Sequence, residues 1–140
     1  MTVDPRRWEH NLDVVRANLA AANARQVATQ ASTLSDDVIY EAPYYDLLAT
    51  GKARVVQMYE AVGERFSSID YRVTASWPTV DPDLVICEVR GDNLVRGSDH
   101  RYQNHYIMFV TLRDGLIVRW VEYSDPKVYD RAAAAGRPGA

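Results

Sequence analysis

Cysteine is nearly absent from this sequence of 140 residues, because Cys87 is the only one. A lone cysteine cannot form an internal disulfide, and its place in the apolar run Leu84–Cys87 favours a small buried hydrophobe over a nucleophile. The sequence also lacks an apolar run of the roughly 20 residues that span a bilayer, and no apolar signal core follows Arg6 and Arg7. We therefore expect a cytoplasmic protein that does not bind membranes.

A strong excess of one charge is missing as well. The formal net charge is -3, from 16 basic and 19 acidic residues, and the basic residues are scattered, so we expect no nucleic-acid partner. The sequence contains no glycine-rich phosphate loop and no Gly-x-Ser-x-Gly elbow, which argues against nucleotide chemistry and serine hydrolysis. His10, His100 and His105 lack the spacing of a metal site. We expect no metal and no cofactor.

The first half of the chain has the apolar spacing of helices. After Asp4-Pro5, apolar residues recur on one face, which predicts a capped amphipathic helix. That face consists of Trp8, Leu12, Val15 and Leu19. An alanine-rich segment at 23–34 predicts a second helix, and the apolar residues between Gly51 and Phe66 predict a third.

From Ile69 onward the apolar period changes to two, which is typical of strands. Four strands are predicted, at Tyr71–Trp77, Leu84–Arg96, Arg101–Arg113 and Leu116–Tyr123. Asp114-Gly115 supplies the two-residue turn of a hairpin between the last two. Helices followed by an antiparallel meander predict an α+β fold in which three N-terminal helices cover one face of the sheet. We expect a single domain over residues 1–131 and a flexible tail over residues 132–140.

The closing segment Asp114–Pro126, with the helices and the meander before it, looks like the SnoaL-like branch of the nuclear-transport-factor-2-like superfamily. Within this branch, segments Asp81–Asp92 and Tyr102–Tyr106 resemble the phenazine-biosynthesis A/B proteins most closely. The resemblance covers nearly the whole chain. It implies a ketosteroid isomerase-like cone, in which helices and a curved antiparallel sheet enclose a deep apolar pocket, usually in a homodimer. It leaves the activity open, because isomerases, cyclases, epoxide hydrolases and non-catalytic binding proteins share the fold.

Glu122 is the candidate reactive group. Val118, Trp120 and Glu122 share one face of the last predicted strand, because side chains alternate along a strand. If that face lines the pocket, burial would raise the pKa of the carboxyl group and let it donate or accept a proton near neutral pH. The resemblance implies the same role, since the phenazine A/B proteins carry a catalytic glutamate at this position. The alternative is a surface glutamate paired with Arg119 or Arg113.

Arg90 and Asp92 form a second candidate catalytic group. Their two-residue spacing places both on one strand face, where a guanidinium can hold a carboxylate by two hydrogen bonds. Limonene epoxide hydrolases carry a similar pair at nearly the same distance before the closing carboxylate. They also carry a Tyr-x-Asn that this chain lacks, and Tyr40, Tyr44 and Asp46 are only partial substitutes. A solvated ion pair at a strand bulge is the alternative.

The remaining candidate ligand-binding residues are Met58, Asn104, Tyr106 and Trp120. Asn104 and Tyr106 share a face with apolar residues and predict a polar pair at the mouth of the pocket. Met58 occupies the position of a pocket histidine in the phenazine A/B proteins, which argues against phenazine condensation itself. A methionine suits a bulky apolar ligand, although ordinary core packing explains it equally well.

These residues predict a cofactor-independent acid-base enzyme of the isomerase, cyclase or condensation type, acting on a small and largely apolar cyclic metabolite. One alternative is an epoxide hydrolase in which Arg90, Asp92 and Glu122 act together. The other is a non-catalytic small-molecule binding or dimerisation module. Either way, we expect a homodimer.

Overall fold

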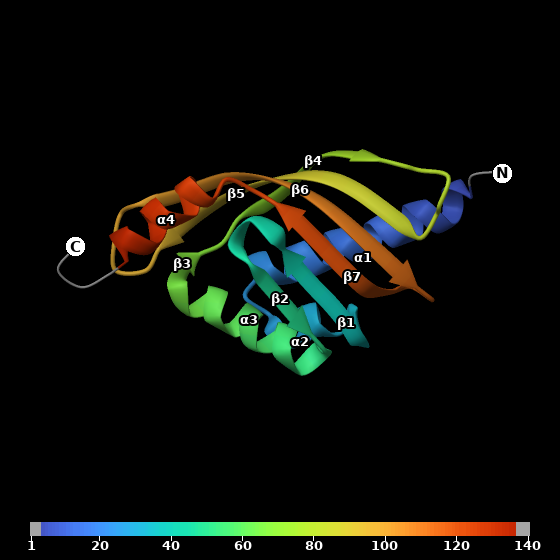
Figure 1. Cartoon of the computed structure of the whole chain (residues 1–140), viewed down its shortest axis with the longest axis horizontal. Coiled ribbons are helices and arrows are strands. Elements are labelled where there is room, and N and C mark those ends of the chain that lie inside the picture. The colour runs from blue at the N-terminus through green and yellow to red at the C-terminus, as the bar shows by residue number, and fades with distance from the viewer. Residues whose placement is uncertain (1–3, 137–140) are drawn as a thin grey trace.

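The computed structural model describes residues 4–136 and has the predicted α+β fold (Figure 1). The helices are α1 (Pro5–Asn23), α2 (Val27–Ala31), α3 (Lys52–Arg65) and α4 (Pro126–Ala135), with a short 3-10 helix η1 (Pro43–Tyr45). The strands are β1 (Leu34–Ala42), β2 (Leu47–Thr50), β3 (Phe66–Ser68), β4 (Tyr71–Trp77), β5 (Leu84–Val95), β6 (Arg101–Arg113) and β7 (Leu116–Tyr123). No helix among residues 4–136 is both long and apolar enough to cross a membrane.

Helix α1 begins at a side-chain cap and ends before a residue with a positive φ. The side chain of Asp4 accepts a hydrogen bond from the backbone N–H of Arg7 at 3.2 Å, and Pro5 occupies the first turn. The predicted second helix at 23–34 is wrong in extent, because only Val27–Ala31 is helical. Arg25 takes a positive φ of 60° after α1 and breaks the helix, and Leu34 already belongs to a strand.

The seven strands form one sheet in the order β2-β1-β7-β6-β5-β3, with β4 also paired to β5. The predicted meander is confirmed, since β4, β5, β6 and β7 pair consecutively and antiparallel. Asp114 and Gly115 both have positive φ, as the tight turn between β6 and β7 requires. A parallel pairing of β1 with β7 then extends the sheet to the β1–β2 hairpin.

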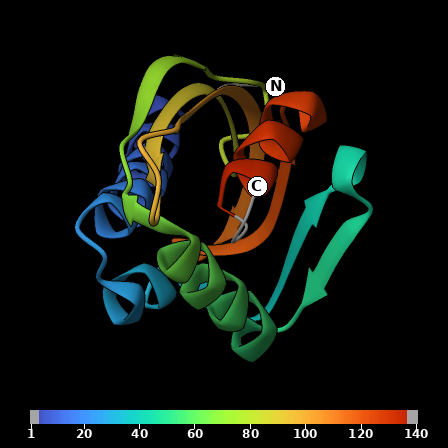
Figure 2. The same cartoon turned by 90° about the vertical axis from the view of Figure 1, so that its left-hand side faces the viewer.

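The sheet is strongly curved, and helices lie across its open side (Figure 2). Irregular pairing interrupts four of its ladders, and one of these irregularities leaves Val118 of β7 without a partner on β6. Because of this bulge, Ile117 and Trp120 both lie on the buried side of the sheet despite their odd spacing. Apolar side chains of α1 and α3 pack against this concave side and form the core.

Helix α4 crosses one end of the curled sheet (Figure 2). Asp125 caps it by accepting a hydrogen bond from the N–H of Lys127 at 2.9 Å, and Ala132 is only 1% exposed. The flexible tail predicted from residue 132 is therefore wrong at its start, because α4 continues to Ala135 and packs against the sheet. The rest of that predicted tail, residues 137–140, lies outside the described residues.

Candidate active site

Two adjoining cavities lie between the concave face of the sheet and the helices. The first, with a volume of about 580 Å³, reaches α1 and is called the α1 cavity. The second, of about 610 Å³, reaches η1 and α4 and is called the α4 cavity. Six residues line both: Tyr40, Met58, Val62, Tyr71, Tyr106 and Glu122. Volumes of this size are typical of small-molecule sites.

Glu122 lies where the two cavities meet. Its carboxyl oxygen Oε1 accepts hydrogen bonds from the hydroxyl group of Tyr40 and from the indole N–H of Trp120, the latter at 3.1 Å. No residue in the described part of the chain donates a hydrogen bond to Oε2 or forms an ion pair with this side chain. The predicted face of β7 is confirmed for Trp120 and Glu122, and one oxygen of the carboxyl group is left for a ligand.

The surface alternative for Glu122 is wrong. Arg119 pairs with Glu41 at 3.4 Å and Arg113 pairs with Asp37 at 2.9 Å, both at exposed positions. Glu122 instead faces the cavities with Tyr40 and Trp120 beside it. The alternation along β7 therefore separates Arg119 and Glu122 onto opposite faces of the sheet.

Burial raises the pKa of Glu122 from 4.5 to about 6, although the hydrogen bonds from Tyr40 and Trp120 act in the opposite direction. The same burial, together with the nearby Glu122, raises the pKa of Tyr40 well above its ordinary value. Tyr40 therefore stays protonated and donates to the carboxylate. A carboxyl group with a pKa near 6 exchanges protons readily at neutral pH.

This pKa also makes a prediction about stability. The folded state binds the Glu122 proton more tightly than the unfolded state does. The stabilisation that comes from the protonated carboxyl group is therefore fully present below pH 4.5 and is lost as the pH rises through about 6. Between pH 4 and pH 7, the free energy of unfolding of the wild type should therefore fall by about 2 kcal/mol relative to that of the Glu122→Gln variant, whose amide does not titrate. Urea unfolding at several pH values measures this difference. Equal pH dependence of the two proteins would contradict the raised pKa.

The structure brings most of the predicted ligand-binding residues to the cavities. Tyr40, Met58, Tyr106 and Trp120 line the α1 cavity. Tyr44 and Asp46 line the α4 cavity. Their positions agree with the sequence analysis, and their contact with a ligand stays a prediction.

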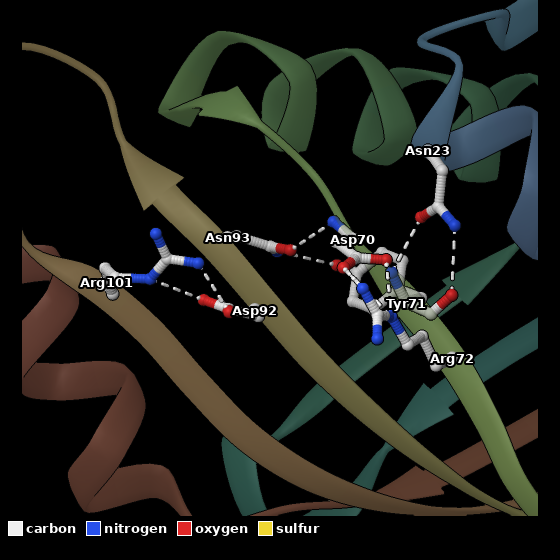
Figure 3. A network of polar contacts seen from close by, with 7 residues as sticks. All are labelled: Asn23, Asp70, Tyr71, Arg72, Asp92, Asn93 and Arg101. Atoms are coloured by element: carbon white, nitrogen blue, oxygen red, sulfur yellow. Dashed lines mark hydrogen bonds and ion pairs between the residues drawn. The ribbon is translucent and has the colours of Figure 1, made fainter.

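Arg90 and Asp92 are the clearest errors of the sequence analysis. Alternation along β5 points Val89, Gly91 and Asn93 toward the core, which places Arg90 and Asp92 on the outer face. Asp92 forms an ion pair with Arg101, with its Oδ1 3.0 Å from the guanidinium Nε (Figure 3). Neither residue lines a cavity, so they do not meet Glu122.

Asn104 is also misassigned as a ligand-binding residue. Its amide nitrogen donates to the hydroxyl of Tyr102 and to the carbonyl of Asp125, both at 3.0 Å. Its amide oxygen accepts from the backbone N–H of Asp125 at 3.3 Å. Asn104 is buried and lines neither cavity. It therefore holds the start of α4 against β6.

Replacing Asn104 by alanine should lower the free energy of unfolding by about 1–3 kcal/mol, because buried groups of Tyr102 and Asp125 lose their partner. Chemical denaturation followed by circular dichroism measures the loss. Gln103→Ala, an exposed position of the same strand, is the matched control and should change stability by less than about 0.5 kcal/mol. Equal losses in the two variants would contradict the anchoring role.

Four polar residues next to the α1 cavity were not among the predicted site residues. They are Asn18 of α1, Tyr59 of α3, Tyr71 of β4 and Asn93 of β5. The spacing of the third predicted helix puts Tyr59 on its apolar face, and the alternation along β4 is the signal that could have marked Tyr71 as inward-facing. Asn18 and Asn93 gave no such signal. A polar residue within an apolar pattern can be assigned to a site only when its hydrogen-bond partners are known, and these partners are distant in sequence.

Among the described residues, no cluster of three or more His, Cys, Asp or Glu side chains is arranged to hold a metal ion. The side chains that face the two cavities include the carboxyl group of Glu122 and several tyrosines.

Comparison with known proteins identifies the fold. The SnoaL-like domain family matches residues 15–120. A candidate isomerase from Bacillus subtilis is 21% identical, with a TM-score of 0.84 over 94% of this chain and 96% of that one. A LEH-like epoxide hydrolase from M. tuberculosis is 20% identical, with a TM-score of 0.75 over 91% and 92% of the two chains.

A candidate polyketide cyclase from Xanthomonas campestris pv. campestris is 16% identical, with a TM-score of 0.79 over 94% of this chain and 99% of that one. The search of curated proteins finds no match to this sequence. At these identities the solved structures show a shared fold, and the activity has to be argued from the residues of the site.

Proposed function

The chain belongs to the SnoaL-like domain family, and from this premise we propose that it is a cofactor-independent acid-base enzyme of the isomerase or cyclase type. Its substrate is a small, largely apolar ring compound held in the two cavities, and Glu122 moves the proton. This family includes isomerases, polyketide cyclases and epoxide hydrolases, so the proposal selects one chemistry within its range.

A single observation carries the proposal: the carboxyl group of Glu122 lies at the junction of the cavities, with Oε1 held by two donors and Oε2 without a hydrogen-bond donor among residues 4–136. A carboxylate used only for structure would be expected to bind a cation or to use both oxygens. Here burial without a counter-ion raises its pKa to about 6 instead. Such tuning is characteristic of groups that transfer protons.

The geometry suggests how the residue works. Tyr40 and Trp120 hold Oε1 and so aim Oε2 at the ligand. The carboxylate takes a proton from a carbon of the substrate, and the resulting carboxylic acid returns the proton to a different position of the same ring. This transfer is an isomerisation with no net gain or loss of protons or electrons, and it needs no cofactor.

Hydrogen–deuterium exchange tests the proposal directly. The protein is incubated in D2O with a panel of mono-, bi- and tricyclic ketones, and loss of acidic C–H signals is followed by proton NMR. We expect catalysed exchange whose rate rises with pH through about 6 and then levels off, because the carboxylate is the base. No exchange above the buffer rate with any ring ketone would overturn the proposal.

Epoxide hydration by Arg90, Asp92 and Glu122 together is not favoured by any contact in the site. Arg90 and Asp92 lie on the outer face of β5, across the sheet from Glu122. A non-catalytic binding module remains as the outcome that the exchange experiment would reveal. The predicted homodimer and cytoplasmic location stay predictions.

A further inference from the structure

Two buried asparagine side chains stand behind two tyrosines of the α1 cavity. Asn93 of β5 is 0% exposed and Asn18 of α1 is 1% exposed. Each is within hydrogen-bond distance of one phenol, Asn93 of Tyr71 and Asn18 of Tyr59, at 3.3 Å in both cases. Both tyrosines line the same cavity as Glu122.

The orientation of the Asn93 amide is determined by its backbone neighbour. Its Oδ1 accepts a hydrogen bond from the backbone N–H of Asp70 at 3.0 Å, and a backbone N–H can only donate (Figure 3). The amide nitrogen must therefore face Tyr71, where it donates to the hydroxyl oxygen. Since that oxygen is accepting, the hydroxyl proton of Tyr71 is available for another acceptor.

The backbone of Tyr71 is fixed by hydrogen bonds, and its ring packs closely against β5. The side chain of Asn23, at the end of α1, accepts from the backbone N–H of Tyr71 at 2.7 Å and donates to its carbonyl at 2.9 Å (Figure 3). Gly91 lies behind the ring, where an added Cβ would come within 3.1 Å of ring atoms of both Tyr71 and Tyr106. The phenol therefore has little freedom to turn away from the cavity.

Asn18 fixes the direction of the hydrogen bond to Tyr59 in the same way. Its amide nitrogen lies 3.5 Å from the carbonyl oxygen of Gln30, which can only accept, and its Oδ1 accepts from the Gln30 side chain at 3.3 Å. The amide nitrogen also donates to the hydroxyl of Thr33 at 2.9 Å. The nitrogen has two hydrogens and the Gln30 carbonyl is the most distant of its three acceptors, so Asn18 donates to Thr33 and to the phenol oxygen of Tyr59. The hydroxyl proton of Tyr59 is left for another acceptor.

These two phenols differ from the other tyrosines that surround Glu122. Tyr40 donates to Glu122, and Tyr106 donates to the hydroxyl of Tyr102 at 3.0 Å. Neither Tyr59 nor Tyr71 donates to another residue in the described range 4–136. Burial raises the pKa of both to about 12, so both carry their protons at neutral pH.

We propose that Tyr59 and Tyr71 are paired hydrogen-bond donors for ligand oxygen, and that the substrate is accordingly a ring compound with a carbonyl group. This inference rests on the proposed function, because it supplies the acceptor group that proton transfer by Glu122 needs. When Glu122 takes a proton from the carbon next to the carbonyl, the C–H electron pair forms the C=C bond of an enolate. The C=O π pair moves onto oxygen, where the phenols stabilise the charge.

Two bicyclic probes of matched shape test the inference: 2-tetralone, which has a carbonyl oxygen, and tetralin, which has none. Calorimetric titration should show that the wild type binds 2-tetralone at least about tenfold more tightly than tetralin. Tyr59→Phe and Tyr71→Phe should each weaken 2-tetralone binding by about 3- to 10-fold and leave tetralin binding unchanged. In the double variant, exchange of the 2-tetralone protons in D2O should slow by about 10²-fold.

Tyr123→Phe is the matched control, because Tyr123 lines neither cavity and the substitution keeps the ring that packs against Phe109, so it should affect neither probe. The inference is overturned if the wild type binds 2-tetralone no more tightly than tetralin, or if the double variant keeps the wild-type preference. Failure of the proposed function looks different. In that case Glu122→Gln exchanges 2-tetralone protons as fast as the wild type, while the binding preference still depends on Tyr59 and Tyr71.

Discussion

Replacing Glu122 by glutamine is expected to slow proton exchange of ring ketones by about 10²- to 10⁴-fold, with ligand affinity changed little. Glutamine has nearly the same shape and keeps an oxygen that accepts from Tyr40 and Trp120. It has no basic carboxylate, however, so the pocket is preserved while the proton-transfer group is removed. NMR exchange rates and calorimetric titration of the same samples measure the two properties separately.

Glu41→Gln is the matched control for this variant. Glu41 lies on the neighbouring strand β1 and pairs with Arg119 on the outer face of the sheet, so its replacement should leave exchange unchanged. If Glu122→Gln retained the full exchange rate, another group would be the base. If neither the wild type nor either variant catalysed exchange but all bound ring compounds equally, the domain would be a binding module.

Replacing Trp120 by alanine is expected to lower the free energy of unfolding by about 3–5 kcal/mol, the largest stability loss among these substitutions. Trp120 is 3% exposed, belongs to the core cluster and stacks with Tyr40 at a centroid distance of 6.5 Å. Its removal leaves a large cavity beside Glu122 and deletes one of the two donors to its Oε1. Denaturant titration measures the loss.

Trp77→Ala supplies the comparison for Trp120→Ala, because Trp77 has the same side chain at 47% exposure on β4. It should cost about 1 kcal/mol or less. Similar losses for the two tryptophans would show that the cavity wall at Trp120 contributes no more to stability than an exposed position. A large loss for Trp120 alone would show that the cavity wall is also part of the core.

The spacing of apolar residues along the sequence correctly predicted the helices and strands that have one apolar face packed against the core. Strands β4 to β7 lie within one residue of their predicted bounds, and α1 and α3 occupy the two segments whose apolar spacing predicts amphipathic helices. The segment 23–34 misled because alanine favours helix locally, whereas Leu34 pairs with Ile117 far along the chain. The family was predicted correctly, and its closeness to the phenazine A/B proteins stays a prediction.

Residues of the candidate site could be predicted only where the alternation of side chains along a strand also indicated which face of the strand is buried. Glu122 follows Trp120 on one strand face, and both proved to face the cavities. Arg90 and Asp92 also share a face, but their spacing does not say which face is buried, and Gly91 between them turned out to be the inward residue. Asn104, Asn18 and Asn93 depend on partners far away in sequence, which no local pattern reveals.

The unpaired Val118 has a consequence for how this strand can evolve. Between the β6–β7 hairpin and Glu122, the bulge shifts the phase of alternation by one residue, so Ile117 and Glu122 point inward although five positions separate them. Deleting Val118 would restore regular alternation and leave Ile117 and Glu122 four positions apart, so both side chains would still point inward. A strand without the bulge residue is therefore expected to keep the same pocket-facing side chains, because the bulge and the extra residue compensate each other.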